Sequence, residues 1–169
     1  MATSAPLLVG ISRCLMGDAV RWNGADARWY APAMEAACTF HPVCPEVELG
    51  MGVPREPIHL VRVAGDLRLQ GVSSGRDWTD AFHTWAVARV AILQRLGLVG
   101  FILKSRSPSC GLGVPVHGGG AEVHPGLFAH ALQVHWPALP LVEASALQDP
   151  EVQMEFVRRM RAEAATYSA

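Results

Sequence analysis

Residues 101–111 read FILKSRSPSCG, a short apolar run followed directly by a lysine and by a serine-rich segment that ends in a cysteine and a glycine. The run Phe101-Ile102-Leu103 predicts a buried strand that leads straight into Lys104. The continuation, Ser105–Pro125, is rich in Ser, Gly and Pro and predicts a long loop. Long loops in compact domains are usually functional or mobile, so this loop is a candidate site.

Further apolar runs and helical patterns alternate on both sides of this strand. We expect strands over Leu7–Ile11, Val43–Cys44 and Leu139–Val142, and helices over Arg28–Ala37, from Asp77 to Leu96-Gly97, over Gly126–Trp136 and from Asp149-Pro150 onward. Ile58–Val63 and Leu67–Val72 flank Gly65-Asp66, which suits a tight hairpin turn. Strands that alternate with helices predict an α/β fold, a single-domain three-layer sandwich with a mainly parallel sheet over residues 1–169.

The composition restricts the kind of protein. The chain has 169 residues, of which 50% are hydrophobic, and a net charge of −1, as in a compact globular protein without a large nucleic-acid footprint. No segment approaches the roughly 20 apolar residues that span a bilayer, and the N-terminus lacks the basic start of a signal peptide. We therefore expect a cytoplasmic protein whose cysteines stay reduced, as free thiols, metal ligands or nucleophiles.

Three of the four cysteines lie where predicted strands end. Cys14 follows the first strand, Cys44 closes the second, and Cys110 lies in the long loop. Because sites in α/β sheets form at the carboxyl ends of the strands, these thiols are expected to share one site. Their wide separation leaves inert core thiols as an alternative, although Cys44 precedes a proline and Cys110 lies in a turn-forming segment. Cys38 is expected to be a buried structural thiol on the first predicted helix.

Two other motifs give competing interpretations. His41-x-x-Cys44 would suit a zinc site with three cysteines and one histidine, although a lone histidine beside proline is more often structural. The segment Gly71–Gly75 matches G-x-S-x-G, and His117–Gly120 resembles the oxyanion loop of esterases. In that fold the oxyanion loop precedes the nucleophile, whereas here it follows, which argues against a serine hydrolase.

Four segments carry a resemblance to a known family: SRCLMGDAVRWNG (12–24), HPVCPEVELGMGVPREPI (41–58), GRDWTDAF (75–82) and FILKSRSPSCG (101–111). They resemble the thiouracil desulfidases, a bacterial family formerly described as a domain of unknown function. The resemblance covers about residues 7–160, and its C-P-E and K-S-x-S-P-S-C-G segments are the most specific.

The resemblance implies that Cys14, Cys44 and Cys110 bind a [4Fe–4S] cluster, whereas Cys38 falls outside the matching segments. Such clusters are normally held by four thiolates, so three leave one iron without a protein ligand. An open iron is a Lewis acid that can bind a soft thiocarbonyl sulfur. The implied reaction is non-redox: thiouracil and water give uracil and sulfide.

The same resemblance suggests catalytic roles for Glu46, Lys104 and Ser109. Glu46 would serve as the general base. The alternative is that Glu46 is a surface carboxylate in a turn without a catalytic role. Ser12, Ser107, Ser109 and Lys104 could bind the oxygen or ring nitrogens of the substrate, or donate to cluster sulfides. The alternative for the serines is turn capping. Lys104 is the single lysine of a chain that has thirteen arginines. Either this is chance, or Lys104 occupies a site at which arginine could not perform the same role.

The expected partner is a small thiolated base such as 2- or 4-thiouracil, and the sequence does not predict an oligomeric state. A thiolated nucleoside or tRNA is an alternative substrate, and the lack of a basic patch and of a second domain argues against tRNA. A non-catalytic module that binds or senses a metal, and an interaction domain with inert thiols, remain as alternatives of other classes.

Overall fold

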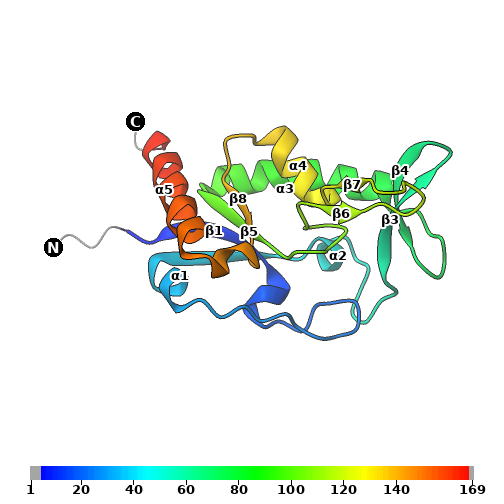
Figure 1. Ribbon diagram of the computed structural model, residues 1–169, viewed down its shortest axis with the longest axis horizontal. Helices are drawn as coiled ribbons and strands as arrows, with labels where there is room; N and C mark the ends of the chain where they lie inside the picture. Colours follow the sequence, from blue (N-terminus) through cyan, green and yellow to red (C-terminus); the bar gives the residue numbers. More distant parts are fainter. Residues whose placement is uncertain (1–4, 168–169) are drawn as a thin grey trace.

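A four-stranded parallel sheet lies at the centre of the molecule, whose computed structural model describes residues 5–167 (Figure 1). Its strands are β1 (Leu7–Ser12), β2 (Cys38–Val43), β5 (Gly100–Leu103) and β8 (Leu141–Glu143), and they lie side by side in the order β2-β1-β5-β8. Every neighbouring pair is parallel. The expected parallel sheet is therefore confirmed.

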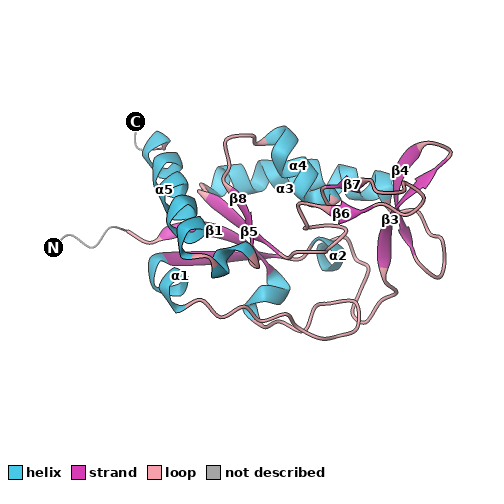
Figure 2. Cartoon of the chain, viewed as in Figure 1, coloured by secondary structure: helices cyan, strands magenta, loops and turns pink. Residues whose placement is uncertain are grey.

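Helices cover both faces of this sheet, as Figure 2 shows. On one face α3 (Thr79–Leu96) packs beside α4 (Leu127–His135), and on the other lie α1 (Pro32–Ala37) and α5 (Pro150–Thr166). A separate core of buried hydrophobic side chains fills each side. This arrangement is the predicted three-layer α/β sandwich.

Alternation along the strands sends neighbouring side chains into different cores. On β5, Phe101 and Leu103 lie in the core on the side of α3 and α4, and Ile102 lies in the core on the side of α1 and α5. Phe101 fits because Gly10 on β1 has no side chain, and a Cβ there would lie 2.2 Å from the Phe101 Cδ2 atom. Burial of each such side chain contributes about 1.5–3 kcal/mol, so the sheet is stabilised from both faces.

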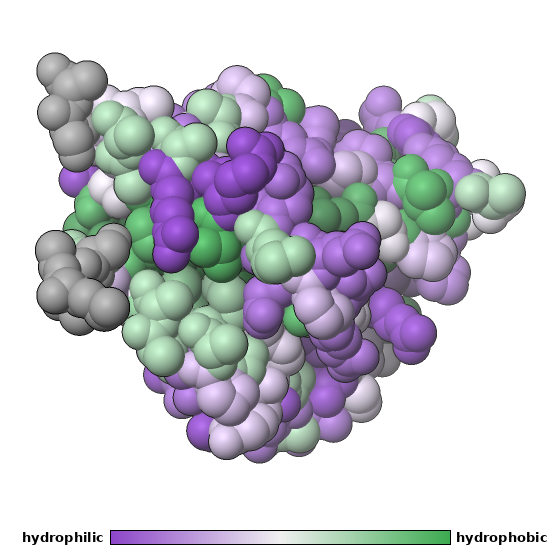
Figure 3. All heavy atoms as spheres, turned by 60° about the vertical axis from the view of Figure 1, so that its left-hand side comes forward, coloured by the Kyte–Doolittle hydropathy of each residue, from purple (hydrophilic) through white to green (hydrophobic). Residues whose placement is uncertain are grey.

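The starts of the two long helices follow the predicted capping signals. Asp77 Oδ1 accepts a hydrogen bond from Thr79 N at 2.9 Å, so α3 begins two residues after the expected cap. Asp149 Oδ1 accepts one from Glu151 N at 2.9 Å and caps α5. The inner face of α5 is buried. On the face of the molecule drawn in Figure 3, hydrophilic side chains stand beside hollows lined by hydrophobic ones.

A β-hairpin of β3 (Ile58–Val63) and β4 (Asp66–Gly71) projects from the end of the molecule away from α5 (Figure 1). Its turn was expected at Gly65-Asp66, but it lies one residue earlier, at Ala64-Gly65. Both turn residues have positive φ, 51° and 90°, as the type I′ turn of a tight hairpin requires. The hairpin is tied to the long loop, because Arg62 forms an ion pair with Glu122.

The helix expected over Arg28–Ala37 is shorter than predicted and begins at Pro32. Proline is favoured at the first helical position, since it has no backbone N–H to donate. The buried residue of this helix is Met34. The structure also corrects the position of Cys38, which is buried as expected but begins β2 instead of lying on the helix.

The remaining elements are short. A 3-10 helix, η1 (Arg13–Met16), follows β1 directly, α2 (Pro45–Glu48) follows β2 after Cys44, and η2 (Ala146–Gln148) precedes α5. The segment expected to be a plain loop, Ser105–Pro125, contains a small antiparallel pair, β6 (Val114–Pro115) with β7 (Val123–His124). Within residues 5–167, no helix is long and apolar enough to cross a membrane.

The strand order places a crevice at one edge of the sheet. From β1 the chain continues to β2 on one side, and it later returns to β5 on the other side of β1. The strand order therefore reverses between β1 and β5, and in open α/β sheets ligands bind outside the carboxyl ends of the strands at such a point. The segments that follow β1, β2 and β5 carry the three candidate cysteines.

Candidate functional site

A cavity of about 420 Å³ opens at the carboxyl ends of β1, β2 and β5. Three thiols, two carboxylates and five basic side chains are among the groups that line it: Cys14, Cys44, Cys110, Glu46, Glu56, Arg13, Arg21, Arg55, Lys104 and Arg106. Ser12, Trp22 and Ser107 also contribute to its wall. Residues from three separate parts of the sequence, 12–22, 43–58 and 104–110, thus meet where the strand order predicts a ligand site.

Cys14 reaches the cavity from η1, immediately beyond β1. Its backbone carbonyl accepts hydrogen bonds from Gly17 N at 3.2 Å and from Ala27 N at 2.9 Å, which fixes the short helix against the following segment. Burial raises the pKa of the Cys14 thiol, while the charges of Lys104 and Arg21 act in the opposite direction. The two cations therefore favour the thiolate, the form that binds metals.

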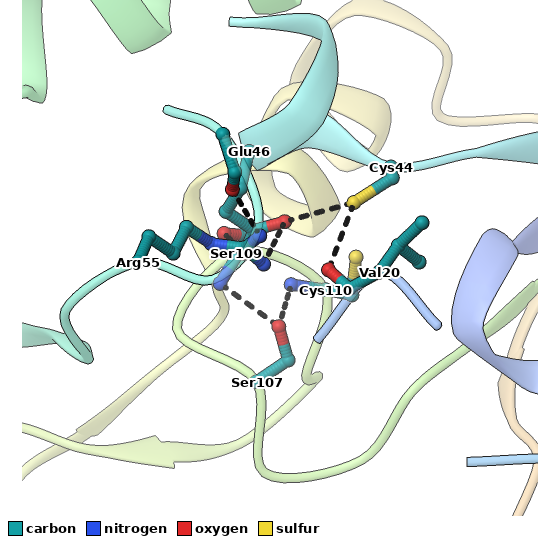
Figure 4. Close-up of polar contacts among 8 residues, drawn as sticks. Val20, Cys44, Glu46, Arg55, Ser107, Ser109 and Cys110 are labelled. Carbon is teal, nitrogen blue, oxygen red and sulfur yellow. Dashed lines mark hydrogen bonds and ion pairs between the residues drawn. The ribbon is translucent and has the colours of Figure 1, made fainter. Parts of the chain in front are cut away.

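Cys44 lies between β2 and α2, where Pro45 occupies the first helical position. Its Sγ atom is 3.6 Å from the Glu46 Oε2 atom and 4.0 Å from the carbonyl oxygen of Val20, and it can donate to either (Figure 4). Burial is the main cause that raises the pKa of this thiol to about 12, and the neighbouring Glu46 carboxylate adds to it. Without a metal, Cys44 is therefore a buried, protonated thiol.

Cys110 is the most enclosed of the three candidate ligands, with 4% of its surface exposed. The Ser107 Oγ atom accepts hydrogen bonds from Cys110 N at 3.1 Å and from Ser109 N at 3.3 Å, which closes the turn that carries the thiol (Figure 4). Burial raises the pKa of the Cys110 thiol well above its ordinary value, Glu46 adds to the effect, and the Ser12 hydroxyl opposes it.

The N-terminus of α4 holds the same loop from the other side. Gly126 N donates to Gly111 O at 2.7 Å, Leu127 N donates to Pro108 O at 3.0 Å, and Phe128 N donates to Ser109 O at 2.9 Å. The first N–H groups of a helix have no partner inside the helix, and here the carbonyls of the cysteine loop supply it. The loop and the helix start are consequently one hydrogen-bonded unit.

Glu46 is the buried carboxylate of the site, with 9% of its surface exposed. Its Oε1 atom accepts a hydrogen bond from Ser109 Oγ at 2.5 Å, and the Arg55 Nη2 atom lies 3.9 Å from Oε2 (Figure 4). Arg55 thus forms an ion pair with a buried carboxylate. A hydroxyl, a thiol and a guanidinium thus surround a carboxylate on the cavity wall, and such a carboxylate can accept a proton from a bound molecule.

Lys104 and Ser12 connect β5 with β1 beside the thiols. Lys104 N donates to the Ser12 Oγ atom at 3.0 Å, and Lys104 Nζ donates to the Ser105 carbonyl oxygen at 2.9 Å. Ser12 is buried, and Lys104 is half-buried. The hydroxyls of Ser12 and Ser107 accept from backbone N–H groups, so turn and strand capping accounts for part of what these serines do.

Several cavity residues were missed by the sequence analysis. Arg13, Arg21 and Arg106 line the cavity, and so does Trp22, which is 46% exposed. All four lie inside the segments that carry the family resemblance, close to Cys14 or Cys110. Nearness in sequence to a candidate ligand was therefore the signal that could have singled them out.

The residues of the competing motifs do not line this cavity. His41 is a β2 residue whose Nε2 atom is 3.3 Å from the Arg89 Nη2 atom, and burial followed by the Arg89 charge lowers its pKa. Ser73 and Ser74 of the G-x-S-x-G motif form a turn after β4 in which Glu56 Oε2 accepts from both backbone N–H groups at 2.9 Å. Neither motif belongs to the thiol-lined site.

The donor set suits a cluster better than a single ion. Within residues 5–167, no three His, Cys, Asp or Glu side chains are grouped closely enough to bind one metal ion. A cluster takes one thiolate at each iron, so its ligands can be spaced more widely around a cavity. Cys38 lies at the opposite end of β2 in the core beside α1, where burial raises its pKa to about 11.

The parallel sheet and the cavity at its carboxyl edge define an α/β protein with a three-cysteine site. A family model described as 2-thiouracil desulfurase matches residues 9–144, and the chain belongs to this family. The resemblance found in the sequence, including the expectation of an enzyme, is thereby confirmed.

Two individual proteins are similar to the chain. The YbbK protein of Bacillus subtilis (strain 168) is 31% identical over 121 residues, which cover 66% of this chain and 78% of that protein. The solved structure of TudS, described as a [4Fe–4S]-dependent thiouracil desulfidase, aligns with a TM-score of 0.71 at 25% identity and covers 89% of this chain and 98% of its own.

Proposed function

We propose that this protein is a thiouracil desulfidase that converts thiouracil and water into uracil and sulfide with the help of a [4Fe–4S] cluster. Family membership and the similarity to TudS support this function. The observation that carries it is the cavity that Cys14, Cys44 and Cys110 line together with Glu46, whose carboxylate is held from behind by Ser109. We further propose that the chain acts as one domain in the cytoplasm, where its thiols stay reduced.

Cys14, Cys44 and Cys110 are the proposed ligands of the cluster. They come from three different segments but share one cavity, and Cys38 lies in a distant part of the core. When bound, the cluster supplies a Lewis-acidic iron that no protein thiolate occupies, which suits the sulfur of a thiocarbonyl group. Burial raises the pKa of the Cys14 thiol, and the charges of Lys104 and Arg21 oppose this rise and so act in favour of its ligand form.

Glu46 is the proposed general base. In the net reaction the oxygen of water bonds to the ring carbon, the carbon–sulfur bond breaks, and sulfur leaves as sulfide. A water proton must be removed as the new bond forms, and the Glu46 carboxylate can accept it. Ser109 Oγ donates to one carboxylate oxygen and Arg55 lies beside the other, so both hold the carboxylate in place toward the cavity.

Lys104, Ser12 and Ser107 are the proposed substrate contacts, whereas Ser109, expected among them, is fully buried and does not line the cavity. The Lys104 ammonium is a compact donor on the cavity wall that can bind the oxygen of the pyrimidine. The hydroxyls of Ser12 and Ser107 already accept backbone hydrogen bonds. Ser107 still has a proton to donate to the substrate or to a cluster sulfide, whereas the Ser12 proton is directed at the Cys110 sulfur and would have to turn from it. Ser109 contributes through its hydrogen bond to Glu46.

The charge of the cavity favours a second candidate substrate, a thiolated nucleotide that carries a phosphate. Arg13, Arg21, Arg55, Lys104 and Arg106 line the cavity, and arginine in particular binds phosphate through paired donors. The net charge of −1 does not support binding of a long RNA. A comparison of kcat/KM for thiouracil and for thiouridine 5′-monophosphate decides between the two: a higher value for the monophosphate would identify the nucleotide as the substrate.

The variant Glu46→Gln tests the acid–base role. Glutamine has nearly the same shape but does not accept a proton at neutral pH, so the variant should bind cluster and thiouracil normally. We expect the chemical step in single-turnover assays at saturating thiouracil to slow by about 10²–10⁴-fold. Fully loaded Glu46→Gln protein that turns over within a few-fold of the wild type would contradict the role. A wild-type protein that binds iron but releases no sulfide would indicate a metal-binding module instead.

A further inference from the structure

Trp22 is a large aromatic side chain that stands half-exposed on the cavity wall. Its exposed fraction is 46%, although an indole buries a large apolar area when it finds a partner. Within residues 5–167, no other aromatic ring and no arginine stacks on it. The indole face is therefore available to a molecule that enters the cavity.

A tight turn presents this indole. Gly24 N donates to Arg21 O at 2.9 Å, Arg21 N donates to Ala25 O at 3.0 Å, and Ala25 N donates to Asn23 Oδ1 at 3.0 Å. The backbone on both sides of Trp22 is held by these bonds. Because the turn is already ordered, little conformational entropy is lost when a ligand binds against the ring.

The turn is also tied to the reactive groups. Arg55 N donates to the Trp22 carbonyl oxygen at 2.8 Å, and the Arg55 side chain lies beside the Glu46 carboxylate. The carbonyl of Val20, two residues earlier, lies 4.0 Å from the Cys44 Sγ atom. Trp22 is thus held in a fixed relation to a proposed cluster ligand and to the proposed general base.

We propose that Trp22 stacks on the face of the pyrimidine ring and selects planar, aromatic thiobases. This inference rests on the proposed function and names the residue that recognises the ring. Every base presents a π-face, whereas the polar groups of Glu46, Ser107 and Lys104 can contact only the ring edge. Stacking on the face would leave the thiocarbonyl edge free to point at the thiol-lined part of the cavity.

Steady-state kinetics of the reconstituted holoenzyme test the stacking. Loss of one base–aromatic contact weakens binding by about 5- to 100-fold, so Trp22→Leu should raise KM for thiouracil by a factor in this range and leave kcat within a few-fold. Trp22→Phe keeps an aromatic face and should lie close to the wild type. The control is Tyr30→Leu, since Tyr30 is also an exposed aromatic residue but is not part of the cavity wall.

A change of substrate separates stacking from a merely structural role. In 5,6-dihydro-2-thiouracil the C5–C6 bond is saturated and the ring is no longer aromatic or planar, so it stacks poorly. The wild type should prefer thiouracil in kcat/KM, and this preference should fall by about fivefold or more in Trp22→Leu but not in Tyr30→Leu. Binding of uracil, measured by calorimetry on the same holoenzymes, should weaken in parallel.

The outcomes are distinct. A wild-type holoenzyme that neither turns over thiouracil nor binds uracil refutes the proposed function. If the wild type turns over thiouracil but Trp22→Leu has an unchanged KM, or an unchanged preference for the planar ring, only the stacking role of Trp22 is refuted and the proposed function stands. A raised KM with a lowered preference for the planar ring, and recovery in Trp22→Phe, supports it.

Discussion

Replacement of Gly126 by alanine should displace the loop that carries Cys110. A Cβ at Gly126 would lie 2.4 Å from the carbonyl carbon of Ser109, 2.6 Å from its oxygen and 2.8 Å from Cys110 N. These are backbone atoms, which cannot rotate away as the end of a side chain can. Carbon atoms pack best at about 3.5–4.0 Å, so the helix start and the loop must separate by about 1 Å.

The expected magnitude follows from two contributions. Overlap in a packed region typically costs about 1–3 kcal/mol, and each weakened backbone hydrogen bond between α4 and the loop adds roughly 0.5–1.5 kcal/mol. We expect Gly126→Ala to lower the free energy of unfolding by about 2–4 kcal/mol. Backbone strain does not contribute, because Gly126 has φ −53° and ψ 151°, which alanine adopts readily. A 1 Å misplacement of reacting groups can cost about 10²-fold in rate.

Urea unfolding, iron analysis and kcat/KM measure these effects, and Gly113→Ala provides the matched control. Gly113 lies in the same loop, but a Cβ there would meet no heavy atom within 4 Å. The control should stay within about 0.5 kcal/mol of the wild type. If Gly126→Ala retains wild-type stability, iron content and activity, the hydrogen-bonded unit of α4 and the loop does not position Cys110.

The remaining predictions concern the ligands and the single lysine. Iron binding and activity should be abolished in each of Cys14→Ala, Cys44→Ala and Cys110→Ala. Cys38→Ala should keep both and lose only about 1 kcal/mol of stability from the core. Loss of iron in Cys38→Ala alone would overturn the assignment. Lys104→Met should lower kcat/KM for thiouracil while iron per chain stays at the wild-type level, and unchanged kinetics would make Lys104 a bystander.

The elements that the sequence predicted well are those that depend on local signals. Apolar runs such as Phe101-Ile102-Leu103 are too short and too hydrophobic for any place but the middle of the sheet. The caps at Asp77 and Asp149 are side-chain hydrogen bonds to nearby backbone, so they can be read from neighbouring residues. The location of the site also followed, because strand ends in a parallel sheet share one edge.

The features that escaped prediction depend on segments far apart in the sequence. Glu46 and Ser109 are 63 positions apart, and only the fold brings the hydroxyl to the carboxylate. The helix start at Gly126 looked like an ordinary N-terminus, and nothing local shows that its N–H groups bind the cysteine loop. The turn at Ala64-Gly65 was misplaced by one residue because alanine rarely adopts positive φ.

In the proposed reaction, three cysteines hold a cluster with which thiouracil is hydrolysed without electron transfer. The most direct measurement is the release of uracil and sulfide from thiouracil by anaerobically reconstituted protein, with iron per chain determined on the same sample. We expect iron equivalent to one four-iron cluster per chain, and equal amounts of uracil and sulfide over many turnovers with no reductant added. A fully loaded protein that leaves thiouracil intact, or one that releases sulfide only when a reductant is supplied, would contradict it.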